Sequence, residues 1–296
     1  MRLSFLFGFL SLISSLAGAT NWPSNIIFEQ GGGRAVRIDV ALQGLKAGQV
    51  LVLGEAHGTQ VQADQQVQAL KTLREMGLKV SVGMEFFDFQ QQAWVDQYRQ
   101  GSISEEEFLK QIQWGQGFPF EAYRQQVLFP NLGSEFVVAL NAPRTLTSQI
   151  AKVGVEGLTN EEKSLLPPGW TLGNSRYFER FRTVMAEHLP SPDALQHYFE
   201  AQSTWDDTMA FRAAEFLKQH PEQVLVIVVG EFHVQYGGGL PDRLRARGLP
   251  VTTMSLLNLE GLSEPEQGLE MEPSPQYGVR ADYVWTSRFS SGVLRP

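Results

Sequence analysis

The sequence predicts an α/β fold with a mainly parallel sheet flanked by helices. Short apolar runs, each long enough for one buried strand, alternate along the chain with longer segments of helical periodicity. Between residues 144 and 219 no strong strand appears, and proline-rich breaks separate several helical segments. We therefore expect an α/β domain formed by residues 20–143 and 220–296, with an inserted smaller all-helical cap at residues 144–219.

The first residues of the chain are typical of a secretory signal peptide. Met1-Arg2 gives a positive start, residues 3–16 are mostly large and apolar, and Ala17-Gly18-Ala19 is a cleavage signature. We expect cleavage near Ala19 and an exported protein, either periplasmic or secreted. An uncleaved membrane anchor is the less favoured alternative, because the apolar run is short for a membrane-spanning helix.

The elements of the predicted fold follow in chain order. Buried strands are expected where apolar runs occur, and the run at 223–229 is apolar enough for a central strand covered on both faces. The expected strands are residues 49–53, 79–84, 135–140, 223–229, 250–256 and 282–286. Helices are expected at residues 59–76, 144–153, 161–165, 176–188, 194–219 and 241–247. Residues 90–131 are expected to be mostly helical, and residues 261–278 to form a surface loop.

Composition excludes several kinds of chemistry. The chain has 296 residues, a formal net charge of −8, five histidines and no cysteine. Without cysteine there is no disulfide, thiolate metal site, covalent haem attachment or cysteine nucleophile. The acidic balance argues against a nucleic-acid partner, because no basic stripe is present to neutralise phosphates.

Polar side chains gather at the predicted carboxyl ends of the strands. Gly54, Glu55 and His57 follow one apolar strand, and a matching Gly-Glu-x-His element ends in His233 after another. Glu85 follows a third strand. Two further candidates, Asn141 and Arg144, follow a fourth. Ligands of open α/β sheets bind beyond the carboxyl ends of strands, so we expect these side chains to form one site. The alternative is structural: Glu55 and Glu231 cap the following helices or pair with Arg144.

Two further segments supply candidates near the same edge. Tyr236 precedes three glycines whose backbone could approach a ligand closely, although the glycines alone are weak evidence for phosphate. Tyr236 is either a haem ligand through its phenolate or an aromatic at the rim, and we favour the rim. Asp206 and Met209 share one face of a helix with Gln202. That face either closes over the site or packs as ordinary core with solvated acids.

The chain resembles the ChaN-type haem-binding proteins of the haem-uptake/Tiki superfamily. The matching motifs occur in the family's order over roughly residues 48–287 and read VLGEAHGTQVQADQQ, GMEFF, QWGQGFPFEAYRQQVLFP, ALNAPR, AQSTWDDTMA, VVGEFHVQYGGGLPDRL and ADYVWT. The resemblance implies a role in bacterial haem or iron uptake or handling, with haem held near the strand ends and a homodimer as one arrangement. The polar set that it implies consists of Glu55, His57, Glu85, Asn141, Arg144, Asp206 and His233.

This chain departs from the family in two places. Many family members carry a lipid-bearing cysteine where this chain has Ala19, so we expect no lipid anchor. Family members often have a second histidine shortly after the first Gly-Glu-x-His, and residues 58–65 contain none.

Three functions fit these observations, and we favour the first. The first is non-covalent haem binding without catalysis, with cofactor contacts from His57, His233, Tyr236, Arg144, Asn141, Asp206 and Met209. The second is a metal-dependent hydrolase with Zn, Mn or Fe held by Glu55, His57, Glu85 and His233. In that enzyme Glu55 or Glu85 would act as general base and Arg144 would orient the substrate. The third is a binding protein for another small ligand.

Overall fold

The computed structural model describes residues 22–30, 32–115, 117–185 and 191–289. The expected signal peptide at residues 1–19 lies outside this part of the chain. Within it, no helix is long and apolar enough to cross a membrane.

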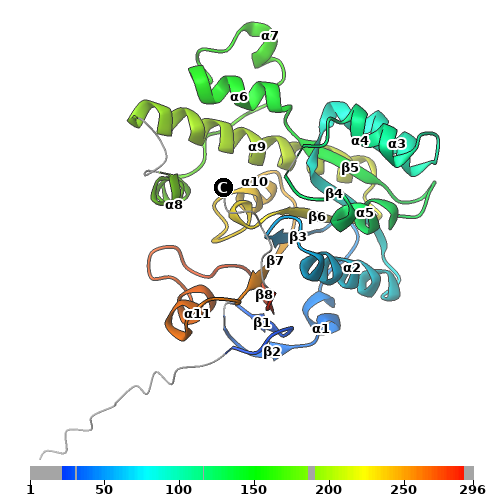
Figure 1. The fold of residues 1–296 in the computed structure, drawn as a ribbon, viewed down its shortest axis with the longest axis vertical. Helices are drawn as coiled ribbons and strands as arrows, with labels where there is room; N and C mark the ends of the chain where they lie inside the picture. The colour runs from blue at the N-terminus through cyan, green and yellow to red at the C-terminus, as the bar shows by residue number, and fades with distance from the viewer. Residues whose placement is uncertain (1–21, 31, 116, 186–190, 290–296) are drawn as a thin grey trace, which may run out of the picture.

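The described strands form one mainly parallel sheet, as predicted (Figure 1). Its order is β2-β1-β8-β7-β3-β6-β4-β5. The pairs from β8 to β5 are parallel, whereas β1 pairs antiparallel with both β2 and β8. The strands are β1 Ile27–Glu29, β2 Ala35–Val36, β3 Val50–Glu55, β4 Lys79–Asp88, β5 Val137–Asn141, β6 Gln223–Gly230, β7 Val251–Asn258 and β8 Tyr283–Ser287.

Helices cover both faces of this sheet. The α-helices of the described residues are α1 Ile38–Leu42, α2 Gln60–Glu75, α3 Gln92–Arg99, α4 Glu105–Gln111, α5 Glu121–Leu128, α6 Arg144–Val153, α7 Asn160–Lys163, α8 Ser175–Met185, α9 Pro192–Gln219, α10 Leu240–Ala246 and α11 Glu264–Met271. Two short 3-10 helices, η1 Phe89–Gln91 and η2 Glu231–His233, follow β4 and β6 directly.

Successive side chains along a strand point to opposite faces of the sheet, so the apolar core is divided into one cluster on each face. On one face, Leu51 and Val226 pack in a cluster with residues of α1, α2 and α5. On the other, Val52 and Ile227 pack with residues of α9 and α10. Helices cover β3 and β6 on both sides, which explains why both strands are continuous apolar runs in the sequence. The strand β6 is therefore the central strand that its sequence predicts.

Most predicted elements occur within a few residues of their expected bounds, but one prediction is wrong. The segment 261–278, expected to be a loop, contains α11. Ser263 and Glu266 form a reciprocal capping box at its start, a helix signal that outweighs the neighbouring prolines and glycines. The short elements β1, β2 and α1 were not expected.

The segment 144–219 is helical in its described residues, and α9 is its longest element. Figure 1 shows α6 and α7 on the outer side of α9. The second half of α9 places Met209, Ala210 and Ala213 against the sheet, while Ala201 in its first half packs against α6. The division of the chain into an α/β domain and a helical cap stays a prediction.

Candidate functional site

The two Gly-Glu-x-His elements lie side by side at the carboxyl edge of the sheet. Parallel pairing of β3 with β6 sets Glu55 opposite Gly230, so the residues after both strands emerge together. Glu85 comes from β4, the other neighbour of β6. The topology therefore brings together the strand-end residues that the sequence predicts, and gives them three adjacent strands as a rigid base.

Glu55 is a buried anchor for His57. Its carboxylate accepts hydrogen bonds from the hydroxyl of Tyr123 and from the side-chain amide of Gln66, the latter at 2.5 Å. The Nδ1 atom of His57 lies 3.1 Å from Glu55 Oε1. Burial and the negative charge of Glu55 raise the pKa of the Tyr123 hydroxyl far above its usual value, which keeps it a donor. The imidazole of His57 is thus oriented by a fixed carboxylate.

His57 is the more accessible of the two site histidines. Its side chain is 37% exposed, and it packs against the rings of Phe86 and Phe118. Its Nε2 atom has no hydrogen-bond partner among the described residues. Burial lowers the pKa of His57, but the hydrogen bond with Glu55 and the charge of Glu85 outweigh burial and raise it above the usual value.

His233 occupies a different environment despite the matching motif. It is buried between two carboxylates, with Nδ1 at 2.7 Å from Asp206 Oδ1 and Nε2 at 3.2 Å from Glu85 Oε1. Burial lowers its pKa, but the charges of Asp206 and Glu85 outweigh that effect and raise it to about 10. The two carboxylates therefore favour the protonated form of His233, in which each ring nitrogen has a proton to donate.

Each carboxylate beside His233 has a second partner. Glu85 Oε2 accepts a hydrogen bond of 2.6 Å from the backbone N–H of Gly230. Burial raises the pKa of Glu85, but His233, His57 and the Gly230 N–H together lower it to about 2, so the carboxylate stays ionised. Asp206 Oδ2 accepts a 2.9 Å hydrogen bond from the hydroxyl of Tyr177. The chain Glu85–His233–Asp206–Tyr177 is a continuous buried network.

The glutamates have structural partners, but not the ones that the structural alternative named. Glu231 forms an ion pair of 2.9 Å with Arg280 and accepts a hydrogen bond from Ser255 of β7. Its carboxylate is therefore held by these structural contacts and does not join the network around His233. Among the described residues neither Glu55 nor Glu231 pairs with Arg144. The side chain of Arg144 is exposed and forms no hydrogen bond or ion pair with the part of the chain that the structure describes.

A cavity of about 700 Å³ opens beside His57. Four aromatic side chains contribute to its walls, and Glu85, Asn141 and Arg144 also line it. Asn141 is held by a hydrogen bond of 3.0 Å from its amide to the backbone carbonyl of Glu85. The aromatic residues are Phe86, Trp94, Trp114 and Trp205.

Not every predicted residue reaches this cavity. Met209 is fully buried in the core between α9 and the sheet. Asp206 is fully buried and acts through His233, and Tyr236 lines a separate cavity. Sequence reasoning missed Tyr123, Gln66 and the aromatic wall. Tyr123, Phe86 and Trp114 lie in the motifs around residues 86 and 114–126, but aromatic residues there are equally compatible with ordinary core, and Gln66 lies in the motif that contains His57.

The four predicted metal ligands contact one another in pairs, His57 with Glu55 and His233 with Glu85. Among the described residues no three histidine or carboxylate side chains are arranged to hold a metal ion. Both ring nitrogens of His233 face carboxylates, and Glu55 and Glu85 are occupied by the partners given above. These side chains therefore do not fit a His/Glu metal site, and we derive no hydrolytic step from one.

Comparison with known proteins adds the family. The family described as haem-binding uptake, Tiki superfamily, ChaN matches residues 41–244. A solved structure of ChaN of Campylobacter jejuni with cofacial haem is similar at a TM-score of 0.60 and 18% identity, over 88% of this chain and 95% of that one. No curated protein sequence matches the chain.

More distant structures resemble the chain less closely. The type III effector HopBA1 has a TM-score of 0.47 and 10% identity, over 82% of this chain and 88% of that one. A mutant of the erythromycin esterase EreC in its open conformation has a TM-score of 0.48 and 12% identity, over 83% of this chain and 92% of that one. Because the family match spans more than half of the sequence, the chain belongs to the ChaN family of haem-binding uptake proteins in the Tiki superfamily.

Proposed function

We propose that this protein is exported, binds haem non-covalently and takes part in the uptake or handling of haem or iron. The haem would occupy the cavity beside His57, and the His57 Nε2 atom would hold its iron. One observation carries the proposal: His57 lines an aromatic cavity, and its Nε2 atom has no hydrogen-bond partner among the described residues. A metal-ligating histidine almost always donates its other N–H to a carboxylate or carbonyl, as Nδ1 of His57 can to Glu55.

The remaining walls of the cavity suit a porphyrin. Trp94 and Trp114 offer flat apolar surfaces, and a volume of about 700 Å³ lies in the range of small-ligand sites. Arg144, exposed at the rim without a partner among the described residues, offers a guanidinium to a haem propionate. His233 supports this arrangement indirectly, because it fixes Glu85 in the cavity wall.

Titration of the purified protein with haemin, followed at the Soret band, tests this proposal. We expect a saturable shift that is lost or weakened at least 10-fold in the His57→Ala variant. The matched control is His197→Ala on α9, which lines neither cavity and should bind haemin like the unaltered protein. A wild-type protein without a saturable shift, or a His57→Ala variant with an undiminished one, would overturn the proposal.

A further inference from the structure

Carboxylates lie beside both ring nitrogens of His57, which lines the larger cavity. A Cβ atom at Gly230 would lie 2.9 Å from His57 Nε2 and 3.5 Å from Glu85 Oε2, so these two atoms border the same position. Glu55 lies on the other side of the ring, with its Oε1 atom 3.1 Å from Nδ1. An iron atom held by Nε2 would therefore have two carboxylates in its surroundings.

We propose that these two carboxylates make the site selective for ferric haem over ferrous haem. The inference rests on the proposed function, because it requires haem iron at the His57 Nε2 atom. The porphyrin core carries a net positive charge when its iron is ferric and is neutral when its iron is ferrous. Carboxylates near the iron therefore stabilise the ferric form preferentially, and more strongly where water is excluded.

The charge of Glu55 is not neutralised by a lysine or an arginine. Its side chain is fully buried, and no lysine or arginine of the described chain lies within ion-pair distance. Apart from His57, its side-chain partners are neutral donors, the hydroxyl of Tyr123 and the amide of Gln66. A hydrogen bond from Nδ1 of His57 to this carboxylate makes the imidazole a more basic ligand, which also favours the ferric state.

Glu85 belongs to a buried network with an excess of negative charge. Its Oε1 atom lies 3.2 Å from His233 Nε2, and Asp206 lies at 2.7 Å from the other nitrogen of that ring. Even with His233 protonated, one imidazolium faces two carboxylates. The N–H of Gly230 holds Glu85 Oε2 at 2.6 Å, beside the position that His57 Nε2 also borders.

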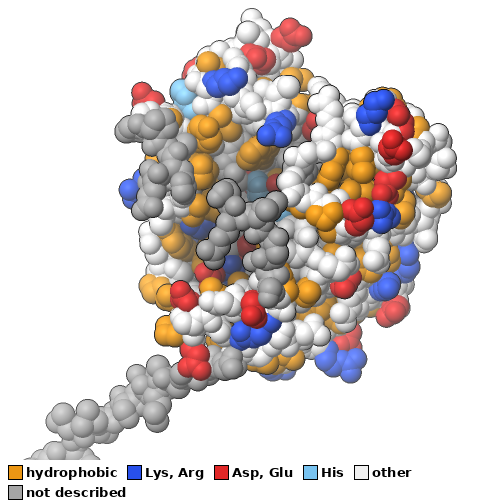
Figure 2. All heavy atoms as spheres, in the orientation of Figure 1, with side chains coloured by type: hydrophobic (Ala, Val, Ile, Leu, Met, Phe, Trp, Pro, Cys, Tyr) orange, Lys and Arg blue, Asp and Glu red, His pale blue; other side chains and the backbone are white. Residues whose placement is uncertain are grey.

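The other charged groups of the cavity do not reverse this balance. Among the described residues, its lining contains two carboxylates, Glu85 and Asp88, and one arginine, Arg144. Asp88 is half-buried and forms no ion pair within the described chain. Arg144 is exposed at the rim, where a propionate would neutralise it. On the face shown in Figure 2, basic and acidic side chains are interspersed, so no broad positive field opposes the carboxylates.

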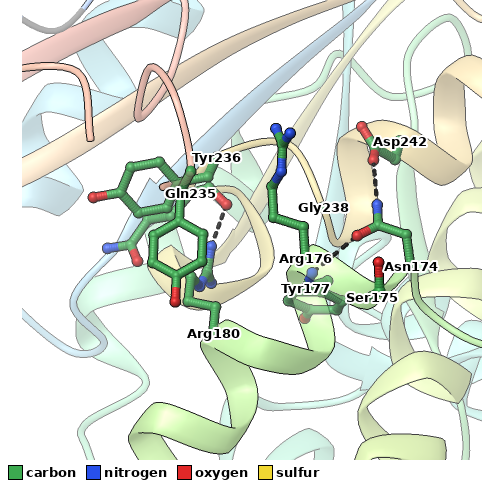
Figure 3. A pocket seen from close by; sticks show the side chains of 10 residues that line it. Asn174, Ser175, Arg176, Tyr177, Arg180, Gln235, Tyr236, Gly238 and Asp242 are labelled. Carbon is green, nitrogen blue, oxygen red and sulfur yellow. Dashed lines mark hydrogen bonds between the residues drawn. The ribbon is translucent and has the colours of Figure 1, made fainter. Parts of the chain in front are cut away.

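Two further arginines lie at the α8 end of the network. Arg176 and Arg180 line the cavity of about 370 Å³ that Figure 3 shows. Arg180 interacts electrostatically with Glu231 and Asp206, and Arg176 interacts with Asp242. Carboxylates in their own surroundings therefore offset these two cations.

Anaerobic titration of the full chain with haemin, and separately with dithionite-reduced haem, measures the two affinities at the Soret band. We expect the ferric form to bind at least 10-fold more tightly. The Glu85→Gln variant should lower the ratio of the two affinities at least 10-fold. The midpoint potential of its bound haem should accordingly rise by about 59 mV or more in a redox titration. Protonation of His57 competes equally with both forms, so it cancels from the ratio.

A second variant and a control accompany this measurement. Glu55→Gln should change the ratio in the same direction, and it decides the test if Glu85→Gln fails to fold. The matched control is Glu75→Gln at the end of α2. The Glu75 side chain is exposed, lines neither cavity and has no partner among the described residues. Its replacement should leave the ratio and the potential unchanged.

The outcomes separate this inference from the function on which it rests. Equal affinities of the unaltered protein for ferric and ferrous haem would overturn the inference and leave haem binding standing. The same conclusion would follow if Glu85→Gln and Glu55→Gln both kept the ratio of the Glu75→Gln control. A protein that binds neither form of haem would overturn the proposed function and this inference with it.

Discussion

The two histidines that follow matching motifs differ in their surroundings, and under the proposed function this difference favours His57 as the iron ligand. His233 lies between Asp206 and Glu85, whose charges raise its pKa to about 10. His57 has only Glu55 within hydrogen-bond distance and keeps one ring nitrogen free among the described residues. The sequence places both at a strand end but cannot separate them, because Asp206 comes from a helix distant along the chain.

The affinity for haemin should fall as the pH is lowered. Only neutral His57 has a lone pair for iron. Because the pKa of His57 is raised, the imidazole becomes protonated at a higher pH than an ordinary histidine does. We expect binding to weaken as the pH falls, through a midpoint above pH 6.5. Replacement Glu55→Gln removes the charge that favours the imidazolium, so it should move this midpoint to lower pH. Soret titrations across pH 5–9 measure both, and a midpoint that Glu55→Gln leaves unchanged would contradict this role of Glu55.

At the scale of single elements, the end of β6 is shaped for the His57 ring. A Cβ atom at Gly230 would lie 2.8 Å from His57 Cε1 and 2.9 Å from its Nε2. We therefore expect Gly230→Ala to displace the imidazole and weaken haemin binding at least 10-fold, with the fold retained. Gly268→Ala is the matched control, because its Cβ meets nothing within 4 Å in α11. That substitution should leave binding unchanged and stabilise the helix by about 0.5–1 kcal/mol. Equal haemin affinities of the two variants would show that the close approach at Gly230 is unimportant.

The elements that the sequence predicts best are those with a strong local signal. The strand β6 is apolar throughout, and α6 matches its expected bounds because its apolar residues follow helical spacing. The site is only partly predictable from such signals. Strand-end residues such as Glu55 and Glu85 are found from their position, whereas Tyr123 reaches Glu55 across 68 residues of sequence. Local patterns do not encode that contact.

At the scale of the whole molecule, α9 connects the helical segment to the sheet. Its second half packs Ala213 and Leu217 against Leu225 and neighbouring residues of β6. Its first half carries Ala201 in the cluster with α6, and Phe199 in the cluster with α8. One uninterrupted helix therefore takes part in both cores, so the helical segment and the sheet should share their stability.

Unfolding of the haem-free protein in urea should accordingly be a single cooperative transition. A helical segment joined to the sheet only by its chain connections could unfold first, but here its loss would remove α9 from the buried face of β3 and β6. We expect tryptophan fluorescence and far-UV circular dichroism to give coincident curves. The Ala213→Gly variant removes one buried methyl group and weakens the helix, so it should move both curves together by about 1 kcal/mol or more. An earlier transition seen by one probe alone would contradict this coupling and would favour an independently folding cap at residues 144–219.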